Sequence, residues 1–163
     1  MLNVSFYLFI YFLVKECKAA VDIAFLVDSS GSISRKNFVK MKNFLKTLVN
    51  SFDIGPDAAH FAIIAYSTKA KTMLKFSDLR GNQITSEAVI KKIDSLPHQR
   101  GLTFIDKALR LAEGEVFNTA NGMRKVIVKV NASLFISLSN LPYTKKIMVI
   151  VIVSFGKLNV IRC

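Results

Sequence analysis

Short apolar runs and amphipathic segments alternate along most of the chain. Residues 21–27 and 60–66 are almost wholly apolar, which is typical of strands buried on both faces. Residues 72–76 alternate apolar and polar side chains, as an edge strand does. Two later apolar runs, at 125–130 and 146–153, predict further strands.

Three intervening segments have the apolar spacing of helices: 36–52, 85–96 and 103–117. In the first of these, Phe38, Met41, Leu45 and Leu48 recur every three or four positions, so they share one helix face. Because strands alternate with helices, the sequence predicts an α/β fold. We expect a doubly wound, mostly parallel sheet flanked by helices, an arrangement of the Rossmann-like type.

Length and composition fit a single folded domain. The 163 residues are enough for one hydrophobic core, and apolar residues make up 52% of them. That fraction excludes a chain that is disordered throughout. No internal repeat or low-complexity linker divides the sequence.

The first residues form a separate segment. Residues 2–14 are mostly apolar and uncharged, but this stretch is shorter than the roughly 20 residues that span a bilayer. Its length suits the hydrophobic part of a signal peptide, cleaved after Ala19. We therefore expect a signal peptide at residues 1–19, a mature domain at residues 20–163 and no stable membrane span. A buried first strand and a wrongly assigned exon are the alternatives. Cleavage would remove one of the two cysteines, so whether they pair stays open.

The chain is basic, with a formal net charge of +12 and no acid after Glu115. A charge of this size favours nucleic acid or an anionic surface as a partner. The cations are not interleaved with aromatic residues and no nucleic-acid-binding motif is present, so we expect no nucleic-acid partner. For a secreted chain, acidic glycans are the anionic partners that this charge allows, and a solvated basic face is the alternative.

The segment FLVDSSGSIS, residues 25–34, places an acid and two hydroxyls at alternate positions: Asp28, Ser30 and Ser32. Asp28 follows a predicted strand, and ligands of parallel α/β sheets bind beyond the carboxyl ends of the strands. Alternate side chains of an extended segment point the same way, so we expect the three oxygens to converge. Hard oxygen ligands with little charge suit Mg²⁺, and Mn²⁺ also fits. The alternative for these residues is a helix N-cap with its turn.

Several segments, in order, resemble one known family. VDIAFLVDSSGSIS is similar to the opening of a von Willebrand factor type A domain, whose metal-ion-dependent adhesion site uses the D-x-S-x-S motif. FAIIAYSTKAKTMLKF resembles its second strand and edge hairpin, and RGLTFIDKALRLA resembles its threonine loop and the helix that follows. GMRKVIVKV resembles the approach to its fourth strand. The resemblance covers about residues 17–129 and points to the extracellular type found in matrilins and collagens.

The resemblance implies four metal ligands. Ser30 and Ser32 correspond to serines that bind the metal through their hydroxyls, and Asp28 corresponds to the acid that holds it mostly through water. Thr103 corresponds to the threonine that joins the metal when ligand is bound, and its alternative role is an N-cap of the following helix. The family has a further acid after its fourth strand, where this chain has Asn131. Because Asn offers only a neutral oxygen, we expect weaker metal binding.

After residue 129 the resemblance fades. The family's last strand and last helix have no counterpart, so we expect a C-terminal end that is truncated or wrongly assigned. Asn131-Ala132-Ser133 is also a glycosylation sequon, and a glycan there would crowd the predicted metal face. An unused sequon is the alternative.

These features predict an adhesion or matrix module that is secreted into the extracellular matrix. The resemblance implies that it binds collagen or another matrix protein, whose carboxylate completes the Mg²⁺ shell. The alternative is a structural interaction domain with a degenerate site that binds no metal. We expect no enzyme, because the sequence has no G-x-S-x-G elbow and no metal-binding His or Cys cluster. His98 is the only candidate base for a serine nucleophile.

Overall fold

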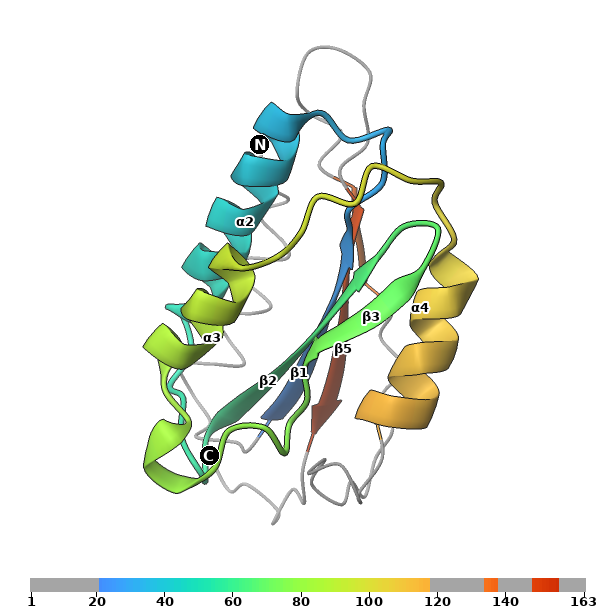
Figure 1. Ribbon diagram of the computed structural model, residues 1–163. Helices are drawn as coiled ribbons and strands as arrows, with labels where there is room; N and C mark the ends of the chain where they lie inside the picture. The colour runs from blue at the N-terminus through green and yellow to red at the C-terminus, as the bar shows by residue number, and fades with distance from the viewer. Residues whose placement is uncertain (1–20, 118–133, 138–147, 156–163) are drawn as a thin grey trace.

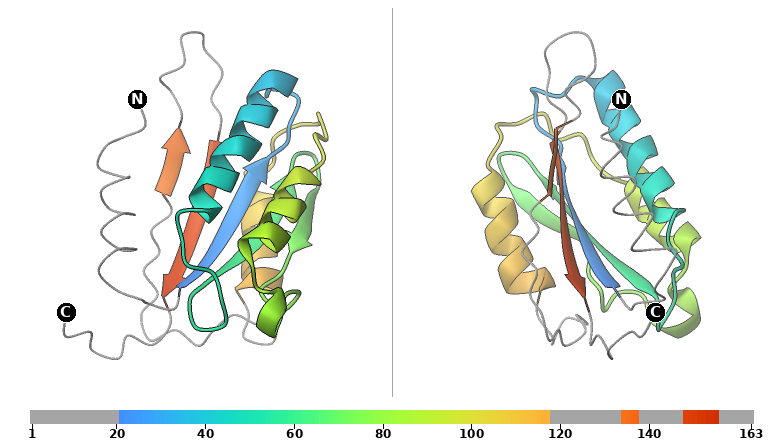
Figure 2. Two further views of the ribbon diagram at one scale, coloured as in Figure 1. Left: turned by 90° about the vertical axis from the view of Figure 1, so that its left-hand side faces the viewer. Right: turned by 180° about the vertical axis from the view of Figure 1, so that it is seen from behind.

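The computed structural model describes residues 21–117, 134–137 and 148–155, which form a five-stranded sheet with helices on both faces (Figure 1 and Figure 2). The strand order is β3-β2-β1-β5-β4. In chain order, the strands are β1 Val21–Asp28, β2 Ala59–Tyr66, β3 Ala70–Leu74, β4 Leu134–Ser137 and β5 Met148–Phe155.

Strand direction differs from the prediction. β1 and β2 run parallel, in register from Val21 opposite Ala59 to Asp28 opposite Tyr66. The other three pairs, β2–β3, β1–β5 and β4–β5, are antiparallel. The α/β class with flanking helices is confirmed, but the described sheet is mixed instead of mostly parallel. The apolar runs did not reveal this, because a strand buried on both faces has the same pattern in either direction.

Among the described residues, three α-helices flank the sheet: α2 Arg35–Val49, α3 Ser86–Asp94 and α4 Ile105–Leu111. α2 and α3 lie on one face of the sheet, and α4 lies on the other (Figure 1). A π-helical turn, Ala112–Val116, continues α4, and a short 3-10 turn, Gly81–Gln83, precedes α3. The three helices predicted from the apolar spacing are therefore present, with their ends shifted by a few residues.

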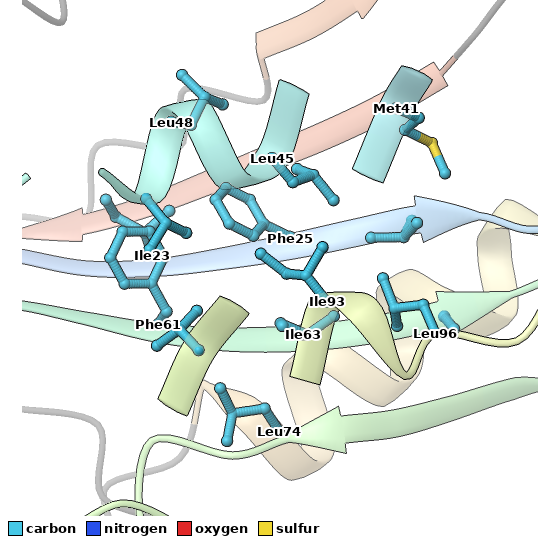
Figure 3. Packing of buried hydrophobic residues seen from close by; sticks show 14 of the residues in the cluster. Ile23, Phe25, Met41, Leu45, Leu48, Phe61, Ile63, Leu74, Ile93 and Leu96 are labelled. Atoms are coloured by element: carbon cyan, nitrogen blue, oxygen red, sulfur yellow. The ribbon is translucent and has the colours of Figure 1, made fainter. Parts of the chain in front are cut away.

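The hydrophobic core lies on both faces of the central strands. Along β1, Ile23, Phe25 and Val27 pack toward α2 and α3, while Ala24 and Leu26 pack toward α4. Figure 3 shows the cluster that contains Ile23 and Phe25, between the sheet and the helices α2 and α3. Burial on two faces explains why β1 is an unbroken apolar run, and dense packing keeps the carboxyl ends of the strands in place.

The described ranges leave some predictions without a structural test. Residues 1–19, the predicted strand at 125–130 and Asn131 lie outside them. The predicted strand at 146–153 corresponds to β5. Within the described residues, no helix is both long and apolar enough to cross a membrane.

Candidate metal site

The carboxyl ends of β1 and β2 meet at one edge of the sheet. Asp28 ends β1 and lies opposite Tyr66, which ends β2. The first turn of α2, the β2–β3 hairpin and the loop 95–104 between α3 and α4 gather at the same edge (Figure 1). Each predicted metal ligand belongs to a strand end or a connection at this edge.

A tight turn brings Asp28, Ser30 and Ser32 together. The Ser30 N–H donates a hydrogen bond to Asp28 Oδ1 at 2.8 Å, and the Ser30 and Ser32 hydroxyl oxygens are 2.9 Å apart. Asp28 and Ser30 are buried, whereas Ser32 is exposed. The expectation of an extended segment is wrong, because residues 29–34 turn and the Ile33 N–H donates to the Ser30 carbonyl at 3.2 Å. The two serine hydroxyls converge in a turn that the Asp28 side chain closes by accepting from the Ser30 N–H.

The donor set of the turn fits a hard divalent cation. Oxygens in neighbouring positions of an octahedral Mg²⁺ shell lie about 3 Å apart, because each metal–oxygen bond is about 2.1 Å long. The Ser30 and Ser32 hydroxyl oxygens are already 2.9 Å apart. Among the described residues, no three His, Cys, Asp or Glu side chains cluster so as to hold a metal. A metal at this turn would therefore be held by hydroxyls, with Asp28 as the nearby carboxylate.

The loop before α4 closes the turn from one side. The Gly31 N–H donates to the Gly101 carbonyl at 2.8 Å, and the Arg100 N–H donates to the Ser29 carbonyl at 2.9 Å. A methyl group on Gly31 would lie 2.6 Å from the Arg100 carbonyl oxygen, so only glycine fits this contact. The geometry of the D-x-S-x-S motif thus depends on a loop far along the chain.

Thr103 lies on this loop between two anchored neighbours. The Leu102 N–H donates to the Thr68 hydroxyl at 2.8 Å, and the Phe104 N–H donates to the Ser67 carbonyl at 3.1 Å. Thr103 is exposed, and no hydrogen bond joins its hydroxyl to the D-x-S-x-S turn. The alternative role of Thr103 as a helix cap is not observed, since Phe104 occupies the cap of α4.

The surroundings of His98 do not suit a catalytic base. Its ring stacks on Phe38 of α2, with ring centroids 4.7 Å apart and ring planes at 10°. Its Nε2 atom lies 3.3 Å from the backbone carbonyl of Ser30. A base must reach the hydroxyl proton that it removes, and this nitrogen instead meets a carbonyl oxygen. His98 therefore ties α2, the turn and the loop before α4 together.

Two further residues at this edge, Ser29 and Tyr66, were not among the predicted metal ligands. The Ser29 hydroxyl donates to the Tyr66 carbonyl at 2.9 Å, which fastens the end of β1 to β2. The Tyr66 side chain is fully buried, and burial raises the pKa of its phenol, with a further increase from the negative charge of Asp28. The phenol therefore stays neutral at physiological pH. Its sequence signal was the Tyr-Ser pair at the end of a predicted strand.

The amino-acid sequence matches the family model of the von Willebrand factor type A domain over residues 22–139. The human collagen alpha-6(VI) chain is 37% identical over 115 residues, which make up 71% of this chain and 5% of that protein. Human integrin alpha-D is 33% identical over 110 residues, which make up 68% of this chain and 9% of that protein. The matched part is thus a small fraction of these relatives, about the size of one domain.

Among solved structures, proximal thread matrix protein 1 from the mussel byssus has a similar fold. Its crystal form 2 matches with a TM-score of 0.56 and 31% sequence identity, covering 69% of this chain and 28% of that chain. A structure of the same protein with a zinc-occupied MIDAS motif matches with a TM-score of 0.56 and 30% identity, over 69% of this chain and 28% of that one. MIDAS denotes the metal-ion-dependent adhesion site, the kind of site that the D-x-S-x-S resemblance implied.

Proposed function

Because the chain belongs to the von Willebrand factor type A domain family, we propose that it is an adhesion module that binds a protein partner through Mg²⁺. The supporting observation is the pair of Ser30 and Ser32 hydroxyl oxygens, 2.9 Å apart beside Asp28. Ser30 and Ser32 would bind the metal directly, Asp28 through water, and Thr103 once the partner is bound. When bound, the metal offers an open coordination place to a carboxylate of the partner. Mn²⁺ fits the same oxygens.

The residues of the turn favour strong attraction of a carboxylate. Asp28 is the one carboxylate in the described turn, so a divalent cation there keeps a net positive charge. Ser30 is fully buried, and its backbone N–H donates to Asp28. Both features restrict the position of the Ser30 hydroxyl before a metal binds. The raised pKa of Tyr66 keeps its phenol neutral, so it adds no negative charge beside Asp28.

An extracellular location and a matrix partner are part of the proposal. The relatives include a collagen chain and an integrin, and residues 1–19 fit a signal peptide. Collagen or another matrix protein is therefore the first partner to test. Acidic glycans are a second class, which the net charge of +12 allows. The proposed module is secreted, binds no nucleic acid and catalyses no reaction.

One observation favours a second candidate function, a structural interaction domain that binds no metal. At the position expected for the family's further acid, the sequence has Asn131, which lies outside the described residues. Divalent metal affinity depends on the number of charged ligands, and Asn contributes a neutral oxygen. A site with one carboxylate in place of two would bind the metal more weakly.

Calorimetric titration of the full chain with Mn²⁺ separates these two functions. We expect binding heat in the wild type and a loss of at least about tenfold in affinity in Ser30→Ala, which removes a direct ligand. Ser95→Ala is the matched control, because its hydroxyl donates to the Lys92 carbonyl at 2.8 Å at the exposed end of α3. A folded wild type that gives no heat would leave the structural domain as the function.

Binding to immobilised collagen then tests the partner. We expect binding that disappears with a chelator and in Asp28→Ala, because both remove the metal that receives the carboxylate. Collagen binding that survives both treatments would contradict a metal-dependent adhesion site. Circular dichroism of Asp28→Ala distinguishes a lost metal from a lost fold.

A further inference from the structure

The loop before α4 exposes two large apolar side chains beside Thr103. Leu102 is 66% exposed and Phe104 is 36% exposed. Single exposed apolar residues, such as Val39 on α2, are ordinary on protein surfaces. Leu102 and Phe104 instead flank a candidate metal ligand. We call this pair the apolar patch, and covering it with a partner is favourable.

Side-chain and backbone contacts hold this patch in place. The N–H groups of Leu102 and Phe104 are bonded to Thr68 and Ser67 of the β2–β3 hairpin. Lys107 Nζ donates to the Thr68 carbonyl at 2.7 Å and lies 4.4 Å from the centroid of the Phe104 ring. A patch that is ordered before binding loses little conformational entropy when a partner arrives.

Cations lie around the same edge of the sheet. Arg35 and Lys36 occupy the first turn of α2, and Arg100 adjoins the D-x-S-x-S turn through its backbone N–H. All three residues are exposed, and their side chains form no ion pair within residues 21–117. The first turn of a helix prefers acids, because the macrodipole is positive there, yet the first turn of α2 contains none. Arg35 and Lys36 are repelled by the positive end of the α2 macrodipole, and a bound anion would offset this repulsion.

Acids at this edge do not balance the cations. The strand ends and connections concerned are residues 28–36, 66–70 and 98–107. They contain the cations Arg35, Lys36, Lys69, Arg100 and Lys107, against the acids Asp28 and Asp106. Asp28 is buried, so the exposed surface that these described residues form is positive even without a metal.

We propose that Arg35, Lys36, Arg100, Leu102 and Phe104 form a specificity collar for an acidic protein segment. This proposal rests on the proposed function, because the collar residues belong to the same edge of the sheet as the candidate metal site. The partner carries an apolar side chain next to the carboxylate that meets the metal, and this side chain covers the apolar patch. Its further carboxylates pair with the collar cations. A sulfated glycan would match the cations but has no apolar side chain for the patch.

The collar cations are expected to weaken the binding of a divalent metal and to strengthen the binding of an acidic peptide. A positive side chain near the site repels a divalent metal and attracts a carboxylate, and each effect changes affinity about a few-fold in water. Removing one collar cation should therefore tighten Mn²⁺ binding about two- to fivefold and weaken an acidic peptide about two- to threefold. A variant that merely damaged the fold would weaken both.

Two synthetic peptides test the apolar patch: acetyl-Gly-Leu-Glu-Glu-Gly-amide and acetyl-Gly-Ala-Glu-Glu-Gly-amide. Their affinities are measured by NMR titration of the full chain in saturating Mg²⁺, and the metal site is measured separately by Mn²⁺ calorimetry. We expect the leucine peptide to bind about three- to tenfold more tightly, because its larger apolar side chain covers the patch. Leu102→Ala should remove this preference and leave the Mn²⁺ affinity unchanged.

Arg100→Gly tests the cations without disturbing the loop. Arg100 has a φ of 59°, a left-handed conformation that glycine adopts freely. This variant should bind Mn²⁺ more tightly and both peptides more weakly. Arg80→Gln removes one exposed positive charge after β3, at the opposite end of the sheet, and should change neither affinity.

Each remaining outcome decides between the proposals. If neither Leu102→Ala nor Arg100→Gly changes the peptide affinities while Mn²⁺ binding is intact, the collar is overturned and the proposed function stands. A wild type that binds Mn²⁺ but neither peptide also overturns the collar and leaves the proposed function standing. Peptide binding in a wild type that binds no Mn²⁺ supports the collar and overturns the metal-dependent function. A heparin tetrasaccharide that binds more tightly than either peptide, equally to wild type and Leu102→Ala, replaces the protein segment with a glycan.

Discussion

Tyr66 lies fully buried at the end of β2, where its environment opposes ionisation. Burial raises the pKa of its phenol above the usual value of 10.0, and the negative charge of Asp28 raises it further. An ionised Tyr66 would carry its charge beside Asp28 without solvent to stabilise it. The ring is therefore a neutral apolar support for the candidate metal site.

This raised pKa predicts a loss of stability at alkaline pH. The folded pKa is higher than the unfolded one, so the stabilisation is complete below pH 10.0 and is lost as the pH rises above it. Above that pH, the free energy of unfolding should fall by about 1.4 kcal/mol per pH unit from this group. Urea unfolding of the wild type and Tyr66→Phe from about pH 9 to about pH 11 measures the difference. If the stabilities of the two proteins changed in parallel with pH, Tyr66 would not be the origin of the alkaline loss of stability.

Single residues also show where the sequence was informative. The spacing of Asp28, Ser30 and Ser32 predicted that three oxygens converge. The turn brings the two hydroxyls together, while Asp28 Oδ1 accepts from the Ser30 backbone N–H. The backbone partner of Gly31 was not predictable, because a loop beyond α3 provides it and no local pattern encodes that contact. Thr103 emerged only from the family resemblance, since a threonine in a loop has no periodicity.

At the scale of elements, the site depends on closure between the turn after β1 and the loop before α4. Gly31→Ala would push a methyl group to 2.6 Å from the Arg100 carbonyl oxygen. The two segments must separate, so we expect a loss of about 1–3 kcal/mol in the free energy of unfolding and weaker Mn²⁺ binding. Urea unfolding and Mn²⁺ calorimetry measure both effects.

Gly55→Ala is the matched control for this closure. No atom lies within 4 Å of a methyl group added at Gly55, so nothing there has to move. Its stability should stay the same or rise slightly, because alanine restricts the unfolded chain more than glycine does. If Gly31→Ala were as stable as Gly55→Ala, contact between the two segments would not determine the geometry of the site.

Helix starts could be predicted more closely than strand directions. α2 begins after Ser34, whose hydroxyl accepts a hydrogen bond from the Asn37 N–H at 3.3 Å. This cap lies beyond the D-x-S-x-S motif, so capping does not explain Asp28, Ser30 or Ser32. Helical periodicity is local, which is why the sequence sufficed for the helices.

At the scale of the whole molecule, strand pairing was the part that the sequence left undetermined. β5 lies antiparallel beside β1, with Phe155 opposite Val21. An apolar run predicts a buried strand, but its neighbour and direction depend on contacts between distant segments. The α/β class survives this difference, because alternating burial on two faces of β1 and β2 requires helices on both sides.

Metal binding should stabilise the whole domain and not the turn alone, because the turn is joined to both central strands and to the loop before α4. A metal that binds only the folded chain adds about 2.7 kcal/mol to the free energy of unfolding at a concentration of about 100 times its Kd. Thermal unfolding with Mn²⁺ should therefore occur at a higher temperature than with a chelator. Ser30→Ala, with its at least about tenfold lower affinity, should show a smaller increase at the same Mn²⁺ concentration. An equal increase in the variant and the wild type would mean that Mn²⁺ binds elsewhere on the molecule.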